Sequence, residues 1–223
     1  MNDHPEVSSL VLEDPLDQNA ATRSRLYGLF VEVFTYPTER TMAGLTDGSR
    51  LEEITEVWRS SPIVMPAVPE PPAATGRGEA KDVPIVYTRM FEAGSGSPPV
   101  SLLERRYVSQ TEHELWEHLL RFYSLFGLDF SNGRTPEQPD HLLTELAFMH
   151  YMSFLEAGAA RGRDDLRRGQ RDFLAHHLSC WLPPFAEALA VERECDPYGA
   201  LARLLAGAVT ADLQYLREIS GAA

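Results

Sequence analysis

The sequence predicts an all-α protein that folds as a single-domain helical bundle. Apolar residues recur at helical spacing along almost the whole chain, and proline, glycine and capping residues separate these segments. A chain of 223 residues with 43% hydrophobic content can bury one sizeable core without needing a second domain. We expect residues 1–19 to form a disordered N-terminal tail and residues 20–220 to form the helical domain.

The first half of the domain should contain two helices followed by a linker. Residues 20–36 carry a buried apolar stripe and stop at Pro37, and residues 51–58 form a shorter acidic helix. Residues 61–82 hold five prolines together with Gly76 and Gly78, which prevents a regular element there. We expect this Pro/Gly linker to be mobile. Residues 83–91 begin with β-branched side chains, but their apolar spacing and the helical context favour a helix.

The later helices carry clearer start and stop signals. Thr111 and Glu114 form a capping box, and the apolar stripe that follows runs until Gly127. Residues 164–182 should form the next helix, broken by Pro183 and Pro184. Pro197 should start the last helix, whose inward face is expected to consist of Leu201, Leu204, Leu205 and Val209.

Charge and cysteine content narrow the function. The formal charge is −13, from 33 acidic against 20 basic residues, so binding to the phosphates of a nucleic acid has no electrostatic support. An acidic surface does attract positively charged peptides. The two cysteines form no CxxC pair, which fits a reducing compartment, and no apolar run is long enough to cross a membrane. We expect a cytoplasmic protein without membrane insertion.

The most informative segment is EQPDHLLTELAFM, at residues 137–149. Pro139 suits the first turn of a helix, and Asp140 can accept hydrogen bonds there as an N-cap. His141 and Glu145 fall on the same helical arc as the apolar residues, so they must pair, bond to backbone, or line a groove that receives a ligand. Two interpretations stay open: a helix cap beside a satisfied core histidine, or a ligand-binding site.

Catalysis finds little support. His141 and Glu145 could present two metal ligands on one helix face, completed by one of the other histidines, but no HExxH motif occurs. GSGSPP, at residues 94–99, lacks the spacing of a phosphate-binding loop and is expected to be a turn. The sequence therefore predicts a protein that is not an enzyme and has no metal or cofactor. A metal-dependent hydrolase is the least favoured alternative.

This segment resembles the signature of the TorD/DmsD-type family of cytoplasmic chaperones for molybdoenzyme maturation. The matching residues are Glu137, Pro139, Asp140, His141, Glu145, Leu146, Phe148 and Met149. Residues 119–131 and 173–189 also look like helices of that family. The resemblance covers about residues 27–216 and implies a TorD-like helical bundle.

The resemblance also implies a function. Such a chaperone binds the apo catalytic subunit of a molybdopterin-containing oxidoreductase, usually through its twin-arginine signal peptide, and holds it for cofactor insertion before export. The resemblance suggests Asp140 and His141 as the core of the peptide site, supported by Glu137, Pro139 and Glu145. It suggests further groove members at Tyr27, Gly94, Pro98 and Pro99, although simple packing explains Tyr27 equally well.

Two alternatives remain at this stage. The chain could be an adaptor that binds the enzyme body without reading a leader peptide, or a chaperone that responds to a nucleotide. No phosphate-binding motif supports the second alternative. A monomer is the expected oligomeric state.

Overall fold

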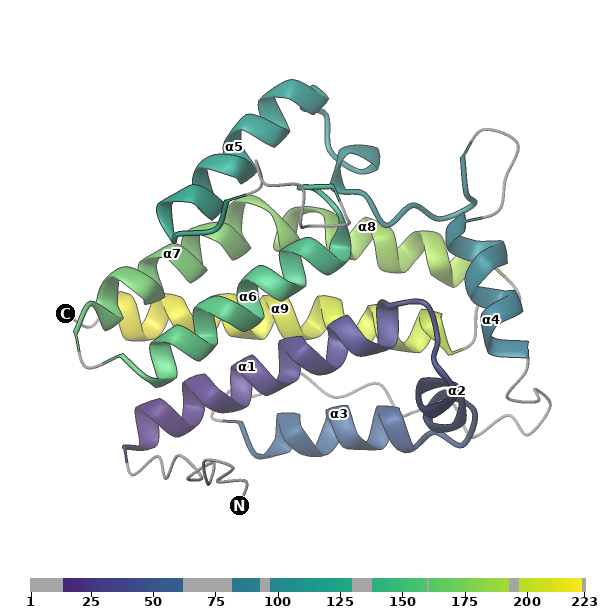
Figure 1. The fold of residues 1–223 in the computed structure, drawn as a ribbon, viewed down its shortest axis with the longest axis horizontal. Coiled ribbons are helices and arrows are strands. Elements are labelled where there is room, and N and C mark those ends of the chain that lie inside the picture. Colours follow the sequence, from purple (N-terminus) through teal and green to yellow (C-terminus); the bar gives the residue numbers. More distant parts are fainter. Residues whose placement is uncertain are drawn as a thin grey trace, which may run out of the picture.

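The computed structural model describes residues 14–61, 82–92, 97–129, 138–159, 161–192 and 197–221. In these ranges the regular elements are all helical, which confirms the predicted all-α bundle (Figure 1). The α-helices are α1 (Pro15–Phe34), α2 (Glu39–Thr46), α3 (Ser49–Arg59), α4 (Asp82–Tyr87), α5 (Glu112–Leu125), α6 (Leu142–Ala157), α7 (Arg163–His176), α8 (Leu178–Val191) and α9 (Tyr198–Gly221), with a π-helical turn η1 (Thr88–Glu92) and a 3₁₀ turn η2 (Glu104–Arg106).

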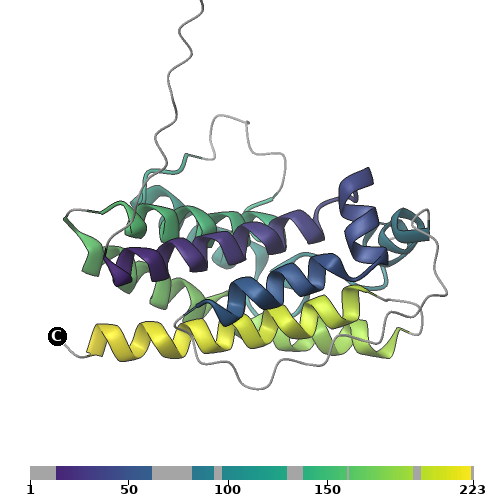
Figure 2. The same ribbon diagram turned by 90° about the horizontal axis from the view of Figure 1, so that it is seen from below.

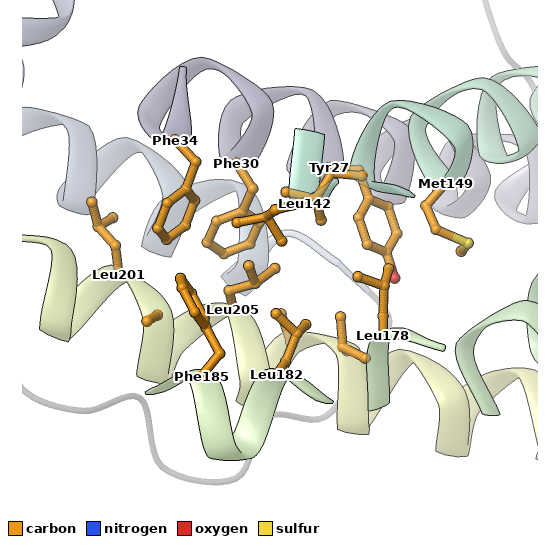
Figure 3. Packing of buried hydrophobic residues seen from close by; sticks show 14 of the residues in the cluster. Tyr27, Phe30, Phe34, Leu142, Met149, Leu178, Leu182, Phe185, Leu201 and Leu205 are labelled. Atoms are coloured by element: carbon orange, nitrogen blue, oxygen red, sulfur yellow. The ribbon is translucent and has the colours of Figure 1, made fainter. Parts of the chain in front are cut away.

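The bundle is built around two central helices and a long returning one. α1 and α6 pack closely side by side and run in opposite directions (Figure 1). α7 and α8 follow one another along the molecule, and α9 returns along both of them. A second view places α1 and α9 in separate layers (Figure 2). Side chains from these layers meet in one apolar core, part of which is formed by Phe30, Leu142, Leu182 and Leu205 (Figure 3).

The first helix begins earlier than predicted. α1 starts at Pro15 rather than at residue 20, because the Asp14 carboxylate accepts a hydrogen bond of 2.9 Å from the Leu16 N–H and Pro15 suits the first helical position. The predicted disordered tail is therefore wrong for residues 15–19, and residues 1–13 lie outside the described ranges. The predicted Pro/Gly linker falls almost entirely on residues 62–81, which also lie outside them.

Several other elements follow their sequence signals. The capping box of Thr111 and Glu114 is present at the start of α5, and Gly127 adopts a left-handed conformation just after its end. Residues 83–91 are helical, but they change from an α-helix to a π-helix at Thr88. α9 begins directly after Pro197 and buries its four predicted core residues. The short helix α2 has no counterpart in the prediction.

The break between α7 and α8 lies at a different residue from the one predicted. The chain turns at His177, with φ −123° and ψ −95°, while Pro183 and Pro184 lie inside α8. The two prolines fall in the second turn of α8, so the carbonyls that lose a donor belong to Ser179 and Cys180 at the partly exposed start of the helix. α8 therefore continues through them.

Candidate functional site

The signature segment forms the turn that leads into α6. His141, not Asp140, is the N-cap: its Nδ1 accepts a hydrogen bond of 3.2 Å from the Leu143 N–H. His141 is half-buried and bonds to backbone, which is one of the three outcomes expected for it, but it does not lie in the core. Pro139 is also half-buried, and its carbonyl accepts a hydrogen bond of 2.8 Å from the Tyr123 hydroxyl. Glu137 lies outside the described residues.

Asp140 points into the protein and is 0% exposed. Its Oδ1 accepts hydrogen bonds from Arg105 Nη1 at 2.7 Å and from Trp116 Nε1 at 2.8 Å. The Arg105 guanidinium also lies over the Trp116 ring, with Cζ 5.7 Å from the ring centroid. An arginine of this same chain therefore occupies the Asp140 carboxylate. A client arginine would reach this group only by displacing Arg105.

A stretch from earlier in the chain pairs with the signature turn. The Leu142 N–H donates to the Leu102 carbonyl at 2.8 Å, and the Glu104 N–H donates to the Asp140 carbonyl at 2.9 Å. Leu102 is thus bonded to the signature turn, and Pro99 lies three residues before Leu102 along the chain. Pro98 is half-buried and Pro99 is exposed, while Gly94 lies outside the described residues.

Glu145 lies one turn into α6 and is fully buried, as its place on the apolar arc predicted. Its Oε2 accepts a hydrogen bond of 3.0 Å from Trp181 Nε1. Burial, followed by the neighbouring Glu104 carboxylate, raises the pKa of Glu145 well above its ordinary value. A fully buried carboxyl group cannot receive a client arginine at the surface.

Two residues that the sequence did not single out complete this interior cluster. Glu104 and His177 are both 0% exposed, and His177 Nδ1 lies 3.0 Å from Glu104 Oε2. Glu104 stands between two leucines and two arginines, and His177 is one of the histidines considered above only for a metal site. No local pattern identifies this pair, because the two residues are 73 positions apart.

Tyr27 lies in a different part of the core from Asp140. Its hydroxyl donates to Asp212 Oδ2 at 2.7 Å, and the same carboxylate binds Arg23 (Figure 3 shows the position of Tyr27). Burial and the Asp212 charge raise the pKa of Tyr27 well above its ordinary value. The structure thus gives Tyr27 a packing role and does not bring it to the signature turn.

The outward side of α6 is unusual for a surface helix. Its exposed or half-buried residues, which we call the α6 outer face, are Leu143, Ala147, His150, Tyr151, Phe154 and Leu155. The two acidic residues of α6, Glu145 and Glu156, both point inward. Phe154 is 63% exposed, and Leu125 at the end of α5 is 74% exposed. The Tyr151 hydroxyl lies 3.5 Å from the Phe126 carbonyl, which places the end of α5 beside this face.

A pocket of about 440 Å³ adjoins the α6 outer face at Ala147 and His150. Gly28 and Leu29 of α1 contribute to its lining, and charged side chains surround it: Arg25, Glu32, Arg40, Arg50 and Glu53. Among the described residues, no group of three or more His, Cys, Asp or Glu side chains could hold a metal ion. Within the same residues, no helix combines the length and apolar character needed to span a membrane.

Comparison with known proteins gives consistent relatives. Residues 68–187 match the family model described as the nitrate reductase delta subunit. The dimethyl sulfide dehydrogenase assembly chaperone protein of Rhodovulum sulfidophilum is 33% identical over 205 residues, covering 85% of this chain and 80% of that protein. The perchlorate reductase assembly chaperone protein of Dechloromonas aromatica is 30% identical over 178 residues, covering 75% of this chain and 77% of that protein.

Closer identity occurs over a shorter stretch. The selenate reductase assembly chaperone protein of Thauera selenatis is 40% identical over 118 residues, which make up 51% of this chain and 61% of that protein. The chain likewise covers 61% of the chlorate reductase assembly chaperone protein of Ideonella dechloratans. These relatives are named as assembly chaperones and not as catalysts. The chain belongs to the nitrate reductase delta subunit family, and the resemblance to TorD/DmsD-type maturation chaperones is confirmed.

Proposed function

We propose that this protein is a cytoplasmic maturation chaperone that binds the apo catalytic subunit of a molybdopterin-containing oxidoreductase and holds it for cofactor insertion and assembly before export. The names of the relatives support the class of client. The observation in this chain that carries the proposal is the α6 outer face, a helix surface without charge that begins next to the signature turn.

The composition of this face argues for a polypeptide partner. A surface helix of a globular protein normally turns its charged residues to solvent and its apolar residues to the core. α6 does the reverse with its two glutamates and exposes an aromatic ring at Phe154. Contiguous exposed apolar surface marks sites of interaction with other proteins. The 16 residues of α6 extend over about 24 Å, enough to contact an apolar helix of about four turns.

A twin-arginine leader contains an apolar stretch of this kind together with positive charge. The apolar stretch would lie on the α6 outer face, with His141, Pro139, Pro98 and Pro99 at the end nearest the signature turn. Asp140 and Glu145 would support this surface from beneath, by holding Arg105 and Trp181. The charge of −13 would attract the arginines over a distance without a dedicated carboxylate at the signature turn.

Titration calorimetry tests this assignment. The purified protein is titrated with twin-arginine leader peptides of molybdoenzymes from its host. We expect one leader to bind, and Phe154→Asp to weaken that binding by at least tenfold, which corresponds to about 1.4 kcal/mol. Val191→Asp is the matched control, since Val191 is an exposed apolar residue at the end of α8, 77% exposed and outside this face. Equal losses in both variants would remove the α6 outer face from the proposal.

The adaptor alternative also has a specific observation in its favour. Both described carboxylates of the signature segment, Asp140 and Glu145, are buried and already bonded, so neither stands ready to read an arginine pair. A chaperone that recognises the enzyme body would need no such group. Binding of a leader-deleted catalytic subunit at full strength, with Phe154→Asp still weakening it, would establish the adaptor in place of the leader reader.

A further inference from the structure

Glu104, Glu145 and His177 form a buried ionisable cluster directly beneath the signature turn. All three side chains are 0% exposed, and they come from η2, α6 and the break between α7 and α8. His177 Nδ1 lies 3.0 Å and 3.2 Å from the two carboxylate oxygens of Glu104. The Glu104 carboxyl group is also a hydrogen-bonding neighbour of Glu145. The three residues are called the acid cluster below.

One oxygen of the carboxyl pair lacks a hydrogen-bond partner among the described residues. His177 Nδ1 lies within hydrogen-bonding distance of Glu104, and Trp181 Nε1 donates to Glu145 Oε2. Glu145 Oε1 is buried and receives no hydrogen bond from any described residue. Two ionised carboxylates side by side in a dry interior repel each other. A proton on Glu145 Oε1 turns that oxygen into a donor to Glu104 and removes the repulsion.

Among the described residues, no arginine or lysine forms an ion pair with Glu104 or Glu145, and His177 is the basic group paired with Glu104. α5 contributes Tyr123 and His118, and the His118 ring centroid lies 4.8 Å from that of His177. The signature turn contributes Asp140, which is acidic, and α7 contributes His176 beside His118. Arg105 is engaged with Asp140 and with Glu112. The His177 ring packs against the rings of Phe122 and Phe173, and its Nε2 has no hydrogen-bond partner among the described residues.

The two carboxyl groups belong to elements that are held in place to different extents. Glu145 belongs to α6, which packs closely against α1. Glu104 belongs to the three-residue turn η2, and two backbone hydrogen bonds join the adjoining chain to the signature turn, Leu142 N–H to Leu102 and Glu104 N–H to Asp140. If the shared proton were lost, repulsion between Glu104 and Glu145 would displace η2, the less firmly held element. Both backbone hydrogen bonds would then open.

We propose that the acid cluster is a proton-linked latch, which holds residues 102–104 against the signature turn while Glu145 carries its proton and releases them when that proton passes to solvent. The consequence for client binding rests on the function proposed above: because the latched turn borders the client site, affinity for the client should fall as pH rises. The opening of the latch itself does not depend on that function.

Amide hydrogen exchange of the client-free protein tests the latch. Exchange at the Glu104 and Leu142 amides is followed by NMR from about pH 5 to about pH 8, where a single released proton changes an opening constant by about tenfold per pH unit. We expect this increase in the wild type, in addition to the intrinsic effect of base catalysis. Glu145→Gln keeps a donor to Glu104 and cannot lose it, so its opening constant should not change with pH.

Glu117→Gln removes one negative charge from the exposed side of α5 and is the charge-matched control. It should keep the pH dependence of the wild type. If Glu145→Gln does not fold, Glu104→Gln removes the other carboxylate of the pair and should abolish the dependence in the same way. An identical pH dependence in the wild type and in a folded glutamine variant would overturn the latch.

Leader-peptide calorimetry at both ends of the pH range separates this inference from the proposed function. Weaker binding at high pH in the wild type, with no change in Glu145→Gln, would support both ideas. Absence of leader binding at every pH, with proton-dependent exchange intact, would overturn leader reading and leave the latch standing. Leader binding without proton-dependent exchange would overturn the latch and leave leader reading standing.

Discussion

At the scale of single residues, the signature segment divides into an outer and an inner half. His141 and Pro139 lie at the surface of the turn, while Asp140 and Glu145 lie beneath it and bind Arg105 and Trp181. The two acidic residues of this short motif therefore hold the turn in position and do not contact solvent. Burial of such groups is costly unless they find partners: Asp140 has two side-chain donors, whereas Glu145 is bonded at Oε2 alone.

Glu145 should make stability depend on pH in a defined direction. The pKa of Glu145 is raised in the folded protein. Below the ordinary pKa of 4.5 the group is protonated in both the folded and the unfolded state, so the raised pKa does not affect stability. As pH rises from 4.5 toward the raised pKa, the free energy of unfolding falls. Glu145→Gln should equal the wild type in free energy of unfolding near pH 4 and exceed it by roughly 1 kcal/mol or more at neutral pH. Urea denaturation at several pH values measures the difference. A constant difference at all pH values would contradict this reading.

Arg105 should matter for stability through Asp140. Arg105→Ala leaves a fully buried carboxylate with Trp116 as its side-chain donor, and the Arg105 side chain is only 19% exposed. We expect a loss of about 2–3 kcal/mol in the free energy of unfolding, less than for a fully enclosed pair because water can enter the vacated space. The neighbouring Arg106 is exposed, and Arg106→Ala should change stability by less than about 0.5 kcal/mol. Thermal unfolding of both variants compares them directly.

At the scale of elements, helix positions are set by polar contacts as well as by apolar packing. Arg23 of α1 binds Asp212 of α9, Glu156 of α6 and Gln170 of α7, and it is fully buried. One side chain thus joins four helices at the end of the bundle away from the acid cluster. Close contact between elements also depends on glycine, for example where Gly169 of α7 meets Phe126 at the end of α5.

Two glycine-to-alanine variants should therefore change the free energy of unfolding in opposite directions. A Cβ at Gly169 would lie 2.2 Å from the Phe126 ring, so Gly169→Ala should lower the free energy of unfolding by about 1–2 kcal/mol. A Cβ at Gly207, inside α9, would meet no atom within 4 Å, so Gly207→Ala should raise it by about 0.5–1 kcal/mol through helix propensity alone. Chemical denaturation distinguishes the two, and a gain at Gly169 would show that the Phe126 ring moves aside freely.

At the scale of the whole molecule, charge and apolar surface have separate roles. The net charge of −13 is spread over the chain, whereas the α6 outer face carries none. Long-range attraction should therefore affect how fast a positively charged client arrives, and apolar contact should affect how long it stays. This division gives the two steps different sensitivities to salt.

Raising the ionic strength should slow association of a twin-arginine leader by about tenfold or more, because salt screens charges separated by more than about 10 Å at 0.1 M. The dissociation rate should change little, since it depends on the apolar contact. Stopped-flow fluorescence with a labelled leader resolves the two rates. A dissociation rate that rises with salt as steeply as the association rate falls would place the charged contacts inside the bound complex.

The sequence by itself determined the fold class, most helices and the family. Apolar periodicity, the capping box at Thr111 and the stop at Gly127 are local signals, and they act within a few residues of where they stand. The signature at Glu145 also predicted correctly that an acid lies on the buried side of its helix. Each of these inferences needed only neighbours along the chain.

Only the tertiary structure decided which partners the buried groups have. Asp140 meets Arg105 and Trp116, and Glu104 meets His177, across separations of 24 to 73 residues. Local pattern placed the cap at Asp140 and the helix break at Pro183, and both were wrong because distant partners change the balance: Arg105 draws Asp140 inward, and Glu104 holds His177 at the break. Charge-assisted hydrogen bonds between distant residues are stronger than the local preferences of single residues. Spacing along the chain does not reveal such pairs.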